Sequence, residues 1–90
     1  MKKTYKIIIE KRVSKKDLTA LPHAQKVAVL ARIEELSTDP YPRGCEKLTA
    51  YKPTTHRVRQ GVYRILYRVH EDIIEIRVIQ VGHRREIYRK

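Results

Sequence analysis

The sequence predicts an α+β domain, in which an N-terminal strand is followed by two helices that pack on one face of a small, mainly antiparallel sheet. The 90 residues suit a single hydrophobic core, so we expect one domain spanning residues 1–90. Apolar residues recur at helical spacing in the first half of the chain and alternate with polar residues in the second half. A hydrophobic fraction of 41% with few glycines and prolines is typical of a folded protein.

The first half of the chain predicts one strand and two helices. Residues 5–9, YKIII, are β-branched and bounded by charge, as in a short strand. Ser14 and Asp17 fit a capping box, so a short helix would begin there and stop near Leu21, because Pro22 disfavours helical geometry in the residue before it. Pro22 suits the first turn of a second helix. One apolar stripe runs along this second helix: Val29, Leu30, Ile33 and Leu36.

The second half predicts three strands, over residues 56–60, 62–70 and 73–81, joined by tight turns at 60–61 and 71–72. Turns at these positions would place Arg57 opposite Arg64, and Arg68 opposite Glu75. One face of the sheet would then form the core, with Val58, Tyr63, Ile65, Tyr67, Val69, Ile74, Ile76 and Val78. The other, open face would carry Arg57, Arg59, Arg64 and Arg68.

The net charge of +11 favours a polyanionic partner, which would be a nucleic acid, a membrane surface or an acidic protein. The apolar run near the N-terminus covers only residues 7–9, which is too short for a signal peptide or a membrane span. The single cysteine, Cys45, cannot form an internal disulfide, which suits a reducing compartment. We therefore expect a cytoplasmic protein.

The arginines of the open face indicate an anion site. From Lys52 to Arg68 the chain has five positive residues and no carboxylate, and Arg57 would lie opposite Arg64 with no acid nearby. Guanidinium groups present forked donors that match phosphate oxygens. A merely solvated face is the plainer alternative, and it fits Arg68, which would pair with Glu75.

The segment VGHRREIY, residues 81–88, adds the groups that an arginine cluster lacks. Gly82 would let the chain bend and carry His83, Arg84 and Tyr88 toward the arginine face. RNA cleavage by attack of the 2′-hydroxyl needs a base, an acid and cations at the phosphate, and it requires no metal. His83 would transfer a proton and Tyr88 would stack on a base or orient the hydroxyl, although a surface histidine and a packing tyrosine are the plainer alternatives. Arg64 and Arg84 would clamp the phosphate.

Other chemistries find little support. Three histidines and the cysteine have no zinc-ligand spacing, and the chain has neither a phosphate-binding glycine loop nor a GxSxG motif. Glu71 and Asp72 point apart at a hairpin tip, so paired acids for a metal-dependent nuclease are missing. We expect no metal and no cofactor.

Three segments in succession, Lys47-Leu48, HRVRQGVYRILY (56–67) and IRVIQVGHRREIY (76–88), resemble the RelE branch of the RelE/ParE toxin superfamily. The resemblance covers residues 5–88 and implies a RelE-like microbial RNase-type fold. It implies a toxin of a type II toxin–antitoxin system, which acts as a ribosome-dependent mRNA endonuclease (an mRNA interferase) and inhibits translation. The implied partners are mRNA, the ribosome and a cognate antitoxin, whose acidic or amphipathic segment would order on the basic surface.

By this resemblance, the functional positions fall on Arg57, Arg59, Arg64, Arg84 and Tyr88, with His83 matching relatives that have histidine before the arginine. RelE proper has lysines in place of Arg57 and Arg59, one of them assigned as proton acceptor. Arginine stays protonated, so these two residues, with Lys52, would bind phosphate instead. The acid–base work would fall to His83, Tyr88 or the ribosome.

Two other function classes stay open. A ParE-like toxin would poison DNA gyrase by protein–protein binding without nuclease activity, but it has no evident use for His83, Arg84 and Tyr88 beside an arginine face. A basic RNA-binding module without catalysis is the third possibility. It is disfavoured because the open face has few aromatic residues for stacking, with Tyr88 the one candidate.

Overall fold

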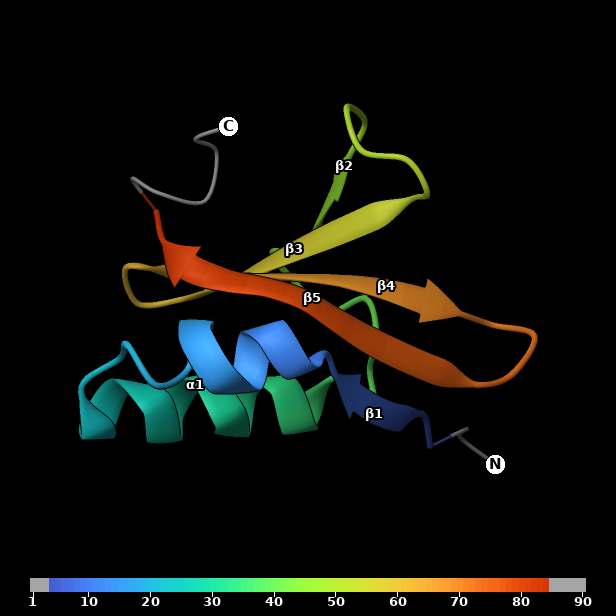
Figure 1. Ribbon diagram of the computed structural model, residues 1–90. Helices are drawn as coiled ribbons and strands as arrows, with labels where there is room; N and C mark the ends of the chain where they lie inside the picture. Colours follow the sequence, from blue (N-terminus) through green and yellow to red (C-terminus); the bar gives the residue numbers. More distant parts are fainter. Residues whose placement is uncertain (1–3, 85–90) are drawn as a thin grey trace.

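A five-stranded sheet organises the computed structural model, which describes residues 4–84 (Figure 1). The strands are β1 (Lys6–Ile9), β2 (Glu46–Leu48), β3 (Thr55–Gln60), β4 (Tyr63–His70) and β5 (Glu75–His83). They lie in the order β1-β5-β4-β3-β2, with β1 parallel to β5 and every other pair antiparallel. The mainly antiparallel sheet and the N-terminal strand are confirmed, whereas β2 was not predicted.

Two helical segments lie on one face of this sheet (Figure 1). The helix α1 (His23–Glu35) follows Pro22, which has extended backbone angles and serves as its N-cap residue. The other segment is one π-helix, η1 (Val13–Asp17), so the first helix is short, as predicted, but it ends before Leu21. Within residues 4–84, neither helix has the length and apolar character needed to cross a membrane.

The capping box predicted for the first helix is wrong. The helical backbone begins before Ser14, whose hydroxyl donates to the carbonyl of Lys11 at 3.1 Å. The Asp17 carboxylate turns to the sheet instead and accepts the backbone N–H of Val81 at 2.9 Å. A long-range hydrogen bond has therefore replaced the local one that the sequence pattern suggested.

The main core lies between the sheet and the helices. Its buried members are Tyr5, Val13, Leu18, Val29, Ile33, Leu36, Val58, Ile65, Tyr67, Ile76, Val78 and Val81. The predicted core face is confirmed, apart from Ile74. This residue lies in the β4–β5 turn with a φ of 51° and is 37% exposed, because the turn takes the longer, four-residue form and spans residues 71–74.

Both hairpins differ in register from the prediction, but the β3–β4 hairpin keeps the predicted faces. Across β3–β4, Arg59 lies opposite Arg64 and Arg57 lies opposite Leu66, so the partner of Arg57 is two residues further along β4 than expected. A shift of two residues preserves the faces, because side chains alternate with a period of two. Gly61, with a φ of 60°, begins the turn rather than ending it.

A bulge in β5 changes the second hairpin. Tyr67 pairs with Val78 and Leu66 pairs with Gln80, which leaves Ile79 as an extra residue. Ile79 packs with Leu66 in a second, small apolar cluster, which Leu48 and Tyr51 cover on the open face. The open face is therefore not uniformly polar: an apolar ridge crosses it between two polar regions.

Candidate nucleic-acid interface

Two arginines lie directly opposite each other on the open face, Arg59 on β3 and Arg64 on β4. Like charges in this position destabilise a sheet unless an anion lies between or beside them. The sequence predicted such a pair but assigned it to Arg57 and Arg64. In the observed register, the pair of opposed arginines is Arg59 and Arg64, one cross-strand pair closer to the β3–β4 turn than predicted.

Arg57 has an acidic neighbour that the sequence did not reveal. Glu46 lies opposite it on β2 and forms an ion pair with its guanidinium group. The side chain of Arg57 is only 10% exposed, whereas that of Glu46 is 57% exposed. The expectation of a cluster free of carboxylates is therefore wrong, because a strand of three residues shows no alternation from which to predict it.

The arginines influence one another electrostatically. Burial is the main reason that the pKa of Arg57 lies below its ordinary value, and the charges of Arg64 and Arg59 lower it further. Burial also lowers the pKa of Arg64, and the charges of Arg59 and Arg84 add to the effect. The carboxylate of Glu46 acts on Arg64 in the opposite direction. These guanidinium groups still stay protonated at ordinary pH, so an anion beside them would relieve their repulsion.

Arg84 joins this group from the end of β5. Its backbone N–H donates to the carbonyl of Val62 at 2.8 Å, which fastens the chain to the β3–β4 turn, and its side chain is exposed. Two residues before it, Gly82, which has no side chain, lies opposite Arg64. We refer to Arg57, Arg59, Arg64 and Arg84 as the arginine cluster.

His83 does not lie on the arginine face. The strand β5 continues through Gly82 without the expected bend, and His83 pairs with Tyr63, their rings meeting edge-on at 5.9 Å. Both rings border a hollow on the helix side, together with Lys16 and other residues. The extra residue at the bulge reverses which β5 side chains face the helices, so the predicted convergence of His83 on the arginines is wrong. Tyr88 lies outside the described residues.

Two further expectations concern the far end of the open face. Arg68 lies opposite Arg77, and its Nε donates to the Thr55 hydroxyl at 3.3 Å, so the predicted pair with Glu75 is wrong. Glu75 instead pairs with Arg77 on the same strand at 3.3 Å. Lys52 lines a hollow beside Arg68, beyond the apolar ridge. Among residues 4–84, no three His, Cys, Asp or Glu side chains are grouped in a way that would hold a metal ion.

The fold and the arginine cluster define a small basic α+β protein with a cationic sheet face. The sequence profile of the family described as "ParE toxin of type II toxin-antitoxin system, parDE" matches residues 7–88. The chain therefore belongs to the RelE/ParE family of type II toxins, which confirms the resemblance seen in the sequence. Toxin RelG of Mycobacterium tuberculosis is 32% identical over 78 residues, covering 86% of this chain and 88% of RelG.

Solved structures show the same fold. The archaeal RelE–RelB complex from Pyrococcus horikoshii has a chain that superimposes with a TM-score of 0.79 at 30% identity, over 92% of this chain and 98% of that one. The toxin–antitoxin complex RelBE2 of Mycobacterium tuberculosis gives a TM-score of 0.77 at 26% identity, over 90% of this chain and 92% of that one.

Proposed function

We propose that this toxin is an endoribonuclease that cleaves mRNA on the ribosome and thereby inhibits translation. The opposition of Arg59 and Arg64 carries the proposal, and Arg84 adds a third cation beside them. Forked guanidinium donors suit a phosphodiester, which would also neutralise the like charges. The RNA backbone is the polyanion that this arrangement fits best.

In the proposed reaction, a 2′-hydroxyl attacks the neighbouring phosphorus and the bond to the 5′ oxygen breaks, leaving a cyclic phosphate. Negative charge builds on the non-bridging oxygens in the transition state, where Arg64 and Arg84 would hold them. Arg57 and Arg59, with Lys52 further along the face, would bind the RNA backbone on either side. Arg57 contributes less, since Glu46 already neutralises part of its charge.

The proton transfers need groups other than arginine. A base removes the 2′-hydroxyl proton and an acid protonates the departing 5′ oxygen. We assign these steps to Tyr88, which follows Arg84 by four residues in the sequence, or to groups of the ribosome. His83 contacts Tyr63 on the helix side and in this proposal supports the end of β5.

The proposal includes a cognate antitoxin. The similar chains from Pyrococcus horikoshii and Mycobacterium tuberculosis were each solved in complex with an antitoxin partner. A net charge of +11 would attract an acidic or amphipathic segment of such a protein. In this proposal the complex resides in the cytoplasm, where the ribosomes are.

The test adds purified toxin to translating ribosomes carrying a defined mRNA and maps the new 5′ ends. We expect cleavage within the codon being decoded, reduced about 10²–10³-fold by Arg64→Ala or Arg84→Ala, as when one transition-state donor is removed. Lys15→Ala is the control, since Lys15 is an exposed cation on η1, on the helix side of the sheet. Full cleavage by Arg64→Ala would reject the assignment.

A ParE-like action is the second candidate, because the matching family profile is that of ParE toxins. Such a toxin would bind DNA gyrase and would have no nuclease activity. An intact message in the ribosome assay, together with inhibited supercoiling by gyrase, would favour this candidate. The arginine cluster would then contact an acidic protein surface rather than a phosphodiester.

A further inference from the structure

A hollow of about 810 Å³ lies on the open face, beyond the apolar ridge from the arginine cluster. Segments distant in sequence build it: the end of β1 and the chain that follows, the β2–β3 loop, and facing parts of β4 and β5. Its polar and aromatic lining is Glu10, Arg12, Tyr51, Lys52, Arg68 and Gln80. The proposed function uses only Lys52 from this set.

The β5 bulge shapes this hollow. Because Ile79 is the extra residue, it and Gln80 both line the open face. A guanidinium nitrogen of Arg12 donates to the carbonyl of Ile79 at 3.2 Å, which holds Arg12 at the rim. On the opposite wall, the Nε of Arg68 donates to the Thr55 hydroxyl at 3.3 Å. Two of the three cations are thus held in place before any ligand binds.

The hollow also has an aromatic wall. Tyr51 packs against Leu66 and Ile79, which form the apolar ridge, and it borders the hollow. A tyrosine ring gives a surface on which a nucleobase can stack, and base–aromatic stacking does not depend on the identity of the base. An aromatic residue beside three cations suits a nucleotide better than it suits a bare anion.

Two side chains of the lining can read a base edge. Gln80 carries both a donor and an acceptor, whereas ionised Glu10 only accepts hydrogen bonds. Adenine and cytosine offer an exocyclic amino group to such acceptors, and uracil does not. The carboxylate of Glu10 repels the phosphates of RNA, so it weakens the general attraction of the three cations for RNA. Its presence in this basic hollow therefore points to recognition of a base.

We propose that this hollow binds one nucleotide of the substrate RNA, with its base stacked on Tyr51 and an exocyclic amino group recognised by Glu10 and Gln80. Arg68 and Arg64 are four residues apart on β4, which places the hollow about 13 Å from the arginine cluster along the strand. One extended RNA strand can therefore contact both. The proposal rests on the proposed function only in taking RNA as the ligand.

The test is a titration of the full chain with 5′-CMP, 5′-UMP and inorganic phosphate, followed by amide NMR. We expect CMP to shift resonances of residues around Glu10, Tyr51 and Gln80, and to bind about fivefold or more tightly than UMP, the low end for one bidentate base contact. The comparison of two nucleotides needs no variant. Cleavage is not measured, so this result is independent of the ribosome assay.

Variants test the roles of Gln80 and Tyr51 separately. Gln80→Leu should bring the affinities for CMP and UMP together, and Tyr51→Leu should weaken both while it keeps the ridge covered. Gln25→Leu is the matched control, because Gln25 is exposed on α1, on the other face of the sheet. Shifts confined to the arginine cluster, equal affinities for both nucleotides, or the same shifts with phosphate alone would each overturn the proposal.

Discussion

The carboxylate of Asp17 accepts the backbone N–H of Val81 at 2.9 Å, across a separation of 64 residues in the sequence. This contact lies past the end of β1, whose pairing with β5 stops at Val78. Asp17 therefore satisfies a backbone donor that the sheet itself leaves unpaired. The strand end held in this way carries Gly82 and leads to Arg84, so a helix side chain helps to fix part of the arginine cluster.

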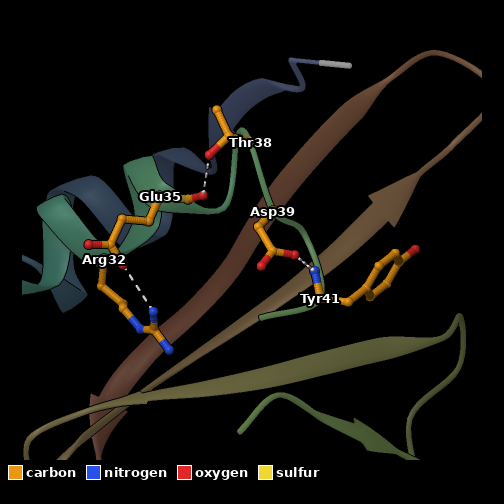
Figure 2. Close-up of polar contacts among 5 residues, drawn as sticks. All are labelled: Arg32, Glu35, Thr38, Asp39 and Tyr41. Carbon is orange, nitrogen blue, oxygen red and sulfur yellow. Dashed lines mark hydrogen bonds and ion pairs between the residues drawn. The ribbon is translucent and has the colours of Figure 1, made fainter. Parts of the chain in front are cut away.

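We predict that Asp17→Ala lowers the free energy of unfolding by about 2 kcal/mol, as expected for a partly buried hydrogen bond to a charged acceptor. Asp17→Asn should lose less, because its amide oxygen can still accept. Asp39→Ala is the control: Asp39 accepts the N–H of Tyr41 at 3.3 Å in an exposed loop, as Figure 2 shows. Urea unfolding measures all three, and equal losses for the two alanine variants would contradict the argument.

This contact also shows where sequence reasoning stops. The alternation of apolar residues identified β3, β4 and most of β5, and it assigned Val58, Ile65 and Tyr67 correctly to the core. The spacing of Ser14 and Asp17 matched a helix cap, but the pattern does not specify which backbone N–H the acid will bind. A long-range partner prevailed, and only the folded sheet supplies it.

The candidate site could be predicted only in part, for two physical reasons. The open-face positions of Arg57, Arg59 and Arg64 follow from the two-residue period, which a register shift of two preserves. The position of His83 could not be predicted from this period. A single bulge at Ile79 places every later side chain of β5 on the face opposite to the one that strict alternation predicts. The partner Glu46 was missed because β2 is too short to show a pattern.

Glu46→Gln tests how far this carboxylate restrains the arginine cluster. The variant should lower the free energy of unfolding by about 1 kcal/mol, since Glu46 is half exposed and exposed ion pairs contribute little. It should also tighten RNA binding, because no carboxylate then offsets the positive charge of Arg57. Urea unfolding and fluorescence anisotropy with a short RNA measure the two effects.

The matched control for Glu46→Gln is Glu35→Gln. Glu35 pairs with Arg32 at 3.0 Å on α1, away from the open face (Figure 2). The same charge change at this position should leave RNA affinity nearly unaltered at moderate salt, where distant charges are screened. Equal tightening in both variants would show that net charge, rather than the contact with Arg57, controls binding.

His56 should make the fold sensitive to acid. Its ring lies between those of Tyr41 and Tyr67, at 5.1 and 5.8 Å, and among the described residues its buried Nδ1 has no hydrogen-bond partner. Burial, and to a lesser extent the charge of Lys47, lowers the pKa of His56 below 6.5. The unfolded chain then binds the proton more readily, so the contribution of His56 to stability is complete above pH 6.5 and is lost as the pH falls.

We predict that His56→Phe, which keeps an aromatic ring between the two tyrosines, removes part of the loss of stability below pH 6.5. Urea unfolding at a series of pH values gives the slope. His23→Phe is the control, because His23 is exposed at the start of α1 and the acid slope should persist. An unchanged slope in His56→Phe would mean that carboxylates alone account for the acid sensitivity.

The salt dependence of RNA binding should separate the members of the arginine cluster. Each phosphate neutralised on a single strand contributes about 0.7 to the slope of log affinity against log salt concentration. Arg59→Gln should therefore reduce the slope by about 0.7. Arg57→Gln should reduce it by less, because Glu46 already pairs with Arg57 and fewer counterions are released there. Exposed Lys15, on η1 on the other face of the sheet, supplies the control variant Lys15→Gln. Fluorescence anisotropy over a range of salt concentrations measures the slopes, and equal reductions for Arg57 and Arg59 would show that Glu46 leaves Arg57 when RNA binds.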